Sequence, residues 1–156
     1  MVLFVNTMVL PVVFAWYLLS KGHIKSIAMA EISDRKLMYF STFILYLMTL
    51  FVLRGFEVPP YVYKYAFGAT LTVGILFVFA LVSKKLSAHL AGLGGLAGAI
   101  VMISIKSQTD FLAFICVLIL FAGIVGMSRL ILNAHKENEI YFGFLLGFFS
   151  QVLIFS

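Results

Sequence analysis

The stretch from Phe111 to Met127, FLAFICVLILFAGIVGM, carries no charged side chain and is long enough to cross a membrane as a helix. Lipid offers the backbone no hydrogen-bond partners, so a spanning segment must satisfy its own N–H and C=O groups, as a helix does. The period-two alternation of a half-buried strand is absent from this stretch. It therefore predicts a transmembrane helix.

Five more apolar stretches have a comparable length. They are Val2–Leu19, Leu37–Leu53, Tyr65–Val82, His89–Ile105 and Ile140–Phe155. Only 11% of the residues are charged and the mean hydropathy is +1.14, whereas a soluble domain keeps about a quarter of its residues charged. Six spans joined by short loops fill the 156 residues. We therefore expect one domain over residues 1–156, an all-α membrane protein with a six-transmembrane-helix bundle.

The net charge of +5 comes from basic residues scattered singly or in pairs near the ends of the apolar stretches. Nucleic-acid binding would require a clustered basic stripe on a soluble domain, so this class of function is excluded. Anionic lipid headgroups or an anionic substrate are the expected partners. The single cysteine, Cys116, lies inside an apolar stretch and has no metal-ligand spacing around it.

The loops expected on one membrane face hold eight Lys and Arg residues, against three on the other face. Such an excess normally marks the cytoplasmic side. Several of the eight are candidate site residues, however, so the orientation stays open. The expected location is multi-pass in the cytoplasmic membrane of a bacterium, and the sequence leaves the oligomeric state undefined.

Glycines concentrate in the fourth stretch at Gly92, Gly94, Gly95 and Gly98. No strand precedes them, so they do not form a dinucleotide-binding loop. Small residues at helical spacing allow membrane helices to approach closely, and this is the role we predict for them.

Ionisable side chains crowd the junction between the fifth and sixth stretches. The pattern Ser-Arg-x5-His-x3-Glu-x3-Gly-x3-Gly is formed by Ser128, Arg129, His135, Glu139, Gly143 and Gly147. His135 and Glu139, four residues apart on a helix, would face the same way. The carboxylate can then hold one imidazole nitrogen and leave the other to attack a phosphorus atom. The spacing predicts a histidine nucleophile with an orienting carboxylate.

A second polar cluster begins the fourth stretch, on the membrane face that six spans would share with the first cluster. It reads Lys84-Lys85-Leu86-Ser87-Ala88-His89. Imidazole titrates near neutral pH, so His89 is a candidate general acid for a leaving oxygen. Arg129 offers a bidentate fork to phosphate oxygens, and Lys84 or Lys85 adds a point charge. These residue types predict cleavage of a phosphate ester at a membrane surface.

The pattern from Ser128 to Gly147 resembles the third motif of the type 2 phosphatidic acid phosphatase superfamily. These are six-helix membrane phosphatases that share a site design with vanadium haloperoxidases. Ser87-Ala88-His89 is similar to their second motif, Pro-Ser-Gly-His, which likewise opens the fourth helix. The number of segments and the placement of the motifs agree along almost the whole chain.

The resemblance implies a specific mechanism. His135 would be the nucleophile that forms a phosphohistidine, and His89 would be the general acid. Arg129 would bind phosphate, together with its neighbour Ser128 and with Ser87 and the adjacent backbone amides. The substrate would be a membrane lipid carrying a phosphate monoester or pyrophosphate, and neither a metal nor a cofactor would be needed.

The chain departs from the family's pattern at several positions. Leu86 replaces the second motif's proline, Ala88 replaces its glycine, and Glu139 stands where the family has aspartate. The first motif, a lysine followed at a distance by Arg-Pro, is not present in that form. Its phosphate-binding duties would pass to the pair Lys84 and Lys85, or to Arg35 and Lys36 in the first loop.

Two other classes of function remain open. The departures at Leu86 and Ala88 favour a catalytically inactive relative that binds phosphate headgroups or scaffolds lipid-handling proteins. A small transporter or channel subunit is the third alternative, but no ionisable residue lies near the middle of a predicted span. Taken one by one, the basic residues also fit interfacial roles, such as lysines that extend from a helix end into the headgroups.

Overall fold

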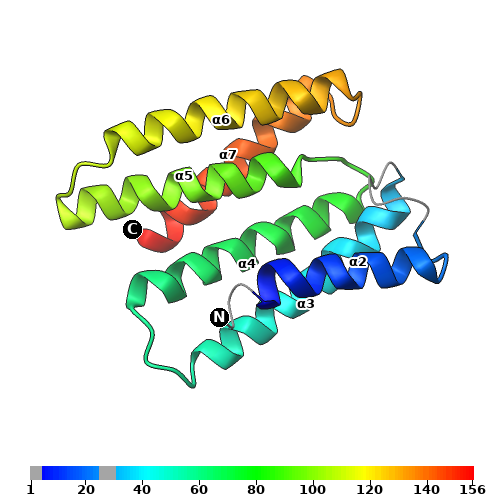
Figure 1. The fold of residues 1–156 in the computed structure, drawn as a ribbon, viewed down its shortest axis with the longest axis horizontal. Coiled ribbons are helices and arrows are strands. Elements are labelled where there is room, and N and C mark those ends of the chain that lie inside the picture. Colours follow the sequence, from blue (N-terminus) through cyan, green and yellow to red (C-terminus); the bar gives the residue numbers. More distant parts are fainter. Residues whose placement is uncertain (1–4, 25–30) are drawn as a thin grey trace. The chain divides into compact units, whose positions relative to one another are not determined.

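The computed structural model describes residues 5–24 and 31–156, and every regular element within these ranges is a helix (Figure 1). In chain order the elements are η1 (Val5–Val9), α2 (Leu10–Ser20), α3 (Ile32–Leu53), α4 (Pro60–Leu81), α5 (Ala88–Ser107), α6 (Leu112–Ile131) and α7 (Glu137–Phe155). The predicted all-α fold class is confirmed. The five helices α3 to α7 are long and apolar enough to cross a membrane, which marks the chain as an integral membrane protein.

The first predicted span is the one that differs most from the long helices. It was expected over Val2–Leu19, of which residues 2–4 lie outside the described part of the chain. The remainder is a shorter apolar helix, Val5–Ser20, in which the π-helical turn η1 passes directly into α2. Pro11 falls in the first turn of α2, where a missing N–H is tolerated.

The C-terminus of α2 is closed by a left-handed glycine. Gly22 adopts φ of 72°, and its N–H donates to the carbonyl of Leu19 at 3.0 Å while the N–H of His23 donates to Leu18 at 2.9 Å. This pair of bonds satisfies two of the carbonyls that a helix end leaves without partners. Lys21, between Ser20 and this glycine, still has right-handed helical backbone angles and continues the last turn of α2.

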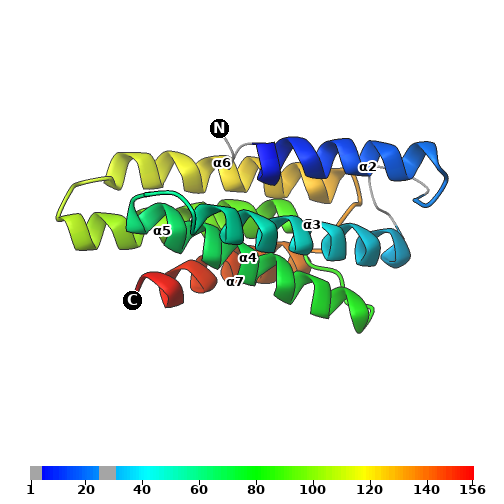
Figure 2. The same ribbon diagram turned by 90° about the horizontal axis from the view of Figure 1, so that it is seen from below.

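The described chain divides into two compact units. Unit 1 comprises Met1–Val58 and Val73–Lys85, and unit 2 comprises Pro59–Thr72 and Leu86–Ser156. In unit 1, α2 lies alongside α3 (Figures 1 and 2), and a small core joins them through Ala15, Leu18, Ile24 and Met38.

In unit 2, α5 and α7 run in the same direction with their backbones in close contact. The space that a side chain at Gly147 would need is occupied by the backbone carbonyl of Ala91, and that at Gly94 by the carbonyl of Phe144. The predicted close packing of the glycine-rich stretch is therefore confirmed, except at Gly92, which faces open space.

The N-terminal half of α4 is joined to α7 by a buried amide. Gln151 is almost fully buried, and its Nε2 donates to the backbone carbonyl of Tyr65 at 3.0 Å. A side chain at Gly68 would collide with the amide of Gln151. Polar side chains in membrane helices often link neighbouring helices in this way.

Candidate functional site

The start of α5 is attached to the first turn of α7 by a main-chain hydrogen bond. The N–H of Ser87 donates to the carbonyl of Glu139 at 3.0 Å. Gly143, one turn further along α7, has no room for a side chain, because its Cβ would lie 2.6 Å from the carbonyl oxygen of Ser87. Ser87 of one polar cluster and Glu139 of the other thus meet within unit 2.

This meeting also places two helix N-termini side by side. Both α5 and α7 begin there, and each leaves backbone N–H groups that carry the positive end of the helix dipole. His89 is the second residue of α5 and is exposed. An anion at this end would be favoured by both helices.

Arg129 and His135 are joined through the turn that ends α6. Asn133 adopts a left-handed φ of 50°, a conformation that asparagine tolerates better than most residues. As a result the N–H of Ala134 folds back and donates to the carbonyl of Arg129 at 3.1 Å. His135 follows directly after this turn.

His135 is paired with the carboxylate that the sequence predicted. Its Nδ1 lies 2.8 Å from Oε2 of Glu139, and the two side chains are only 6% and 20% exposed. When Nδ1 carries the proton that it donates to Glu139, the lone pair of the neutral imidazole resides on Nε2. A nucleophilic role for this nitrogen stays a prediction.

The pairing differs in one respect from the helical spacing that predicted it. His135 precedes α7 instead of lying on it, since Lys136 is the N-cap residue with extended backbone angles. Oε2 of Glu139 also accepts the backbone N–H of Lys136 at 3.3 Å. The side chains meet because the carboxylate caps the helix, and a Glu three residues after an N-cap position is the sequence signal for such a cap.

Arg129 has an unusual environment. It lies in the last turn of α6, and its Nε is buried without a hydrogen-bond partner among the described residues. A buried donor left without an acceptor costs about 1–3 kcal/mol. An anion bound at this guanidinium would supply the acceptor.

The hydroxyls of the two predicted serines bond to the backbone of their own helices. Ser87 is the N-cap of α5, is fully buried, and accepts the N–H of Leu90 at 3.5 Å. Ser128 is exposed and donates to the carbonyl of Ile124 at 2.9 Å, within α6. Phosphate binding by either hydroxyl stays a prediction.

The remaining candidates belong to unit 1. Lys84 is exposed and Lys85 half-buried in the segment between α4 and α5, whereas Arg35, in the first turn of α3, is only 5% exposed. Their part in a phosphate site stays a prediction. Among the described residues, no three His, Cys, Asp or Glu side chains gather in a way that could hold a metal ion.

Comparison with known proteins adds no relative. No protein-family model, no curated protein and no solved structure matches the chain.

Proposed function

We propose that the chain is an integral membrane phosphatase that hydrolyses a lipid-linked phosphate monoester or pyrophosphate through a phosphohistidine. The observation that carries this proposal is the contact of His135 Nδ1 with Glu139, and it is supported by the buried Nε of Arg129, which has no partner among the described residues. A polarised imidazole and a guanidinium nitrogen that needs an acceptor are groups suited to phosphoryl chemistry.

The reaction then has two steps, formation and hydrolysis of the phosphohistidine. Nε2 of His135 attacks phosphorus, the N–P bond forms, the bond to the leaving oxygen breaks, and His89 gives that oxygen its proton. Water next attacks phosphorus, the N–P bond breaks, and His89 takes up the water's proton as phosphate leaves. Arg129 and the helix N-termini of α5 and α7 stabilise the equatorial oxygens in both steps.

A bacterial cytoplasmic membrane is the proposed location. Proteins that span the bacterial outer membrane are typically closed barrels of strands, whereas the apolar segments described in this chain are helices.

The test is phosphate release from phosphatidate and from a polyprenyl pyrophosphate in mixed micelles. His135→Ala is expected to abolish release, and His89→Ala to lower it by about 10²-fold or more. His23→Ala is the matched control, because His23 is exposed, lies in unit 1 and belongs to neither polar cluster. Full turnover in His135→Ala contradicts the mechanism.

The same preparation distinguishes the inactive relative. That alternative requires vanadate binding that depends on Arg129, with no phosphate released from any lipid offered. The environment of Ser87 favours the inactive relative, since its buried hydroxyl is already used as a helix cap.

A further inference from the structure

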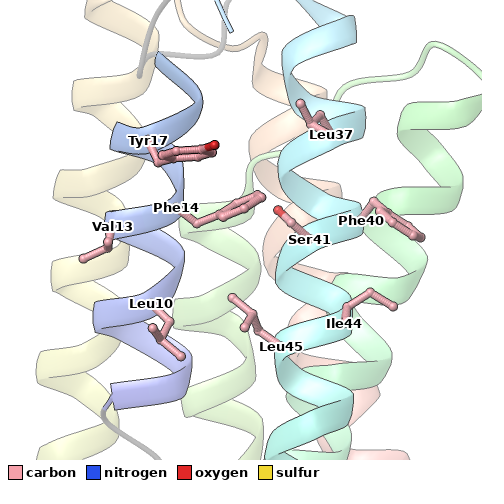
Figure 3. A pocket seen from close by; sticks show the side chains of 9 residues that line it. All are labelled: Leu10, Val13, Phe14, Tyr17, Leu37, Phe40, Ser41, Ile44 and Leu45. Carbon is pink, nitrogen blue, oxygen red and sulfur yellow. The ribbon is translucent and has the colours of Figure 1, made fainter. Parts of the chain in front are cut away.

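A groove in unit 1 lies between α2 and α3, and Figure 3 shows the side chains that line it. They are apolar or aromatic except Ser41, whose hydroxyl donates to the carbonyl of Met38 at 3.0 Å. The lining therefore offers no charged group. The histidines of the proposed reaction, His89 and His135, belong instead to unit 2, where α5 meets α7.

Gly143 of α7 lies directly against the backbone of Ser87, the N-cap residue of α5. A Cβ at Gly143 would lie 2.6 Å from the carbonyl oxygen of Ser87 and 3.1 Å from its nitrogen. Glycine is the residue that allows two backbones to approach so closely. The bond from the Ser87 N–H to the carbonyl of Glu139, one turn before Gly143, forms in this same contact. An added side chain would push the start of α5 away from α7.

This contact is the first of a row along the two helices. One turn further, Ala91 of α5 lies against Gly147 of α7, and one turn beyond that Gly95 lies beside Gln151. The pairs keep the same register at each turn, so the start of α5 has one defined position along α7.

The position of His89 follows from that of Ser87. The hydroxyl of Ser87 accepts the N–H of Leu90 at 3.5 Å, and its carbonyl accepts the N–H of Ala91 at 2.9 Å. These two bonds close the first turn of α5, which contains His89. A displacement of Ser87 would therefore move the backbone of His89 with it.

The predicted nucleophile is held by contacts of a different kind. Nδ1 of His135 lies 2.8 Å from Oε2 of Glu139, and the same oxygen accepts the N–H of Lys136. Both contacts lie within residues 135–139. A shift of α5 would therefore move His89 relative to His135, while His135 and Glu139 stay together.

We propose that Gly143 is a positioning residue for the general acid, an inference that rests on the proposed phosphatase function. By admitting the backbone of Ser87, Gly143 sets the distance from His89 to the phosphorus that His135 attacks. In that step the bond from phosphorus to the leaving oxygen breaks, and His89 gives this oxygen its proton. A displacement of about 1 Å can lower such a rate by roughly 10²-fold.

Leaving groups that differ in their need for a proton distinguish positioning from folding. An alkanol leaves well only if it gains a proton, whereas 4-nitrophenol leaves readily as its anion. With the full chain in detergent micelles and in excess over substrate, release of dodecanol from dodecyl phosphate, or of nitrophenol from 4-nitrophenyl phosphate, measures the first step alone. The ratio of the two rates does not depend on the folded fraction, because unfolded protein lowers both rates equally.

In Gly143→Ala, the rate for dodecyl phosphate should fall by about 10²-fold relative to the rate for 4-nitrophenyl phosphate, as it should in His89→Ala. Gly98→Ala is the matched control. Its Cβ would lie 2.5 Å from the carbonyl oxygen of Phe148, in the same contact of α5 with α7 but about three turns beyond Ser87. It should lose stability to a similar degree and keep the parent ratio of rates.

An equal fall of both rates in Gly143→Ala, or the same change of ratio in Gly98→Ala, would overturn the positioning role and leave the phosphatase activity of the parent standing. Release of both products by His135→Ala at the parent rate would instead contradict the proposed function, and this inference with it.

Ser87→Pro provides a second test if Gly143→Ala does not fold. Ser87 has φ of −80°, close to the angle that proline adopts, and proline removes the N–H that donates to Glu139. The ratio of rates should fall as in His89→Ala. Ser87→Ala also lacks the hydroxyl but keeps the N–H, so it is the control and should retain a ratio close to that of the parent. Equal ratios in the two variants would overturn the proposal.

Discussion

One carboxylate oxygen of Glu139 faces two groups, the imidazole of His135 and the backbone N–H of Lys136. The sequence predicted the first contact from the spacing of four residues. It did not predict that His135 lies before the helix, because that depends on the backbone angles of Lys136 and on the capping bond. The buried Nε of Arg129 was also beyond sequence reasoning, since burial of a single atom depends on the surrounding packing.

Replacing Glu139 by Gln tests whether its carboxylate orients His135, in addition to stabilising the helix N-terminus by its negative charge. The amide can no longer hold a protonated imidazole or fix its tautomer, so phosphate release should fall by about 10²-fold or more. Loss of a negative charge at a helix N-terminus should lower stability by only about 0.3–1 kcal/mol. Glu137→Gln, in the same turn and exposed, is the control. Equal activity in the two variants would show that Glu139 does not orient the nucleophile.

Arg129→Lys keeps the positive charge but removes the buried Nε donor. Vanadate binding, measured by titration, should weaken by about tenfold or more, because a hydrogen bond to a charged group is worth roughly 1.5–3 kcal/mol. The exposed Lys136→Arg variant should bind as the parent does. Unchanged affinity in Arg129→Lys would mean that the Nε donor faces no anion.

At the scale of elements, the apolar stretches predicted the five long helices well, because hydrophobic length alone determines whether a segment can span a membrane. The glycines also predicted that the fourth span packs closely against another helix, although Gly92 faces open space. The π-helical turn before Pro11 and the link between Gln151 and Tyr65 were not predicted. The link depends on a contact between segments that are far apart in the sequence, and the π-helical turn is a local irregularity without a sequence signature.

Two glycine substitutions test the contact between α5 and α7. Gly147→Ala places a methyl group where the carbonyl of Ala91 lies, so the thermal midpoint in detergent should drop by an amount equivalent to about 1–3 kcal/mol. Gly92→Ala meets open space and should be neutral, or stabilising by up to about 1 kcal/mol through helix propensity. Similar midpoints for the two variants would contradict the packing described for unit 2.

At the scale of the whole molecule, we predict that α6 crosses the bilayer between residues 112 and 131. The native thiol Cys116, on the exposed side of α6, should react with an uncharged, membrane-soluble maleimide and resist a charged one in sealed vesicles.

In a Cys116→Ser background, Thr109→Cys and Leu132→Cys place thiols in the exposed loops on either side of α6. A charged, impermeant maleimide should then label them from opposite faces of the vesicle. Labelling of both from the same face would rule out the crossing, and the side that is labelled also determines the orientation that the loop charges left open.

The bond from Ser87 N–H to the carbonyl of Glu139 runs from main chain to main chain. It therefore does not depend on which side chains occupy positions 87 and 139, proline at 87 excepted, so a substitution at either position can leave this link between the two helix ends in place. Gly143 differs, because a side chain there would displace the carbonyl of Ser87.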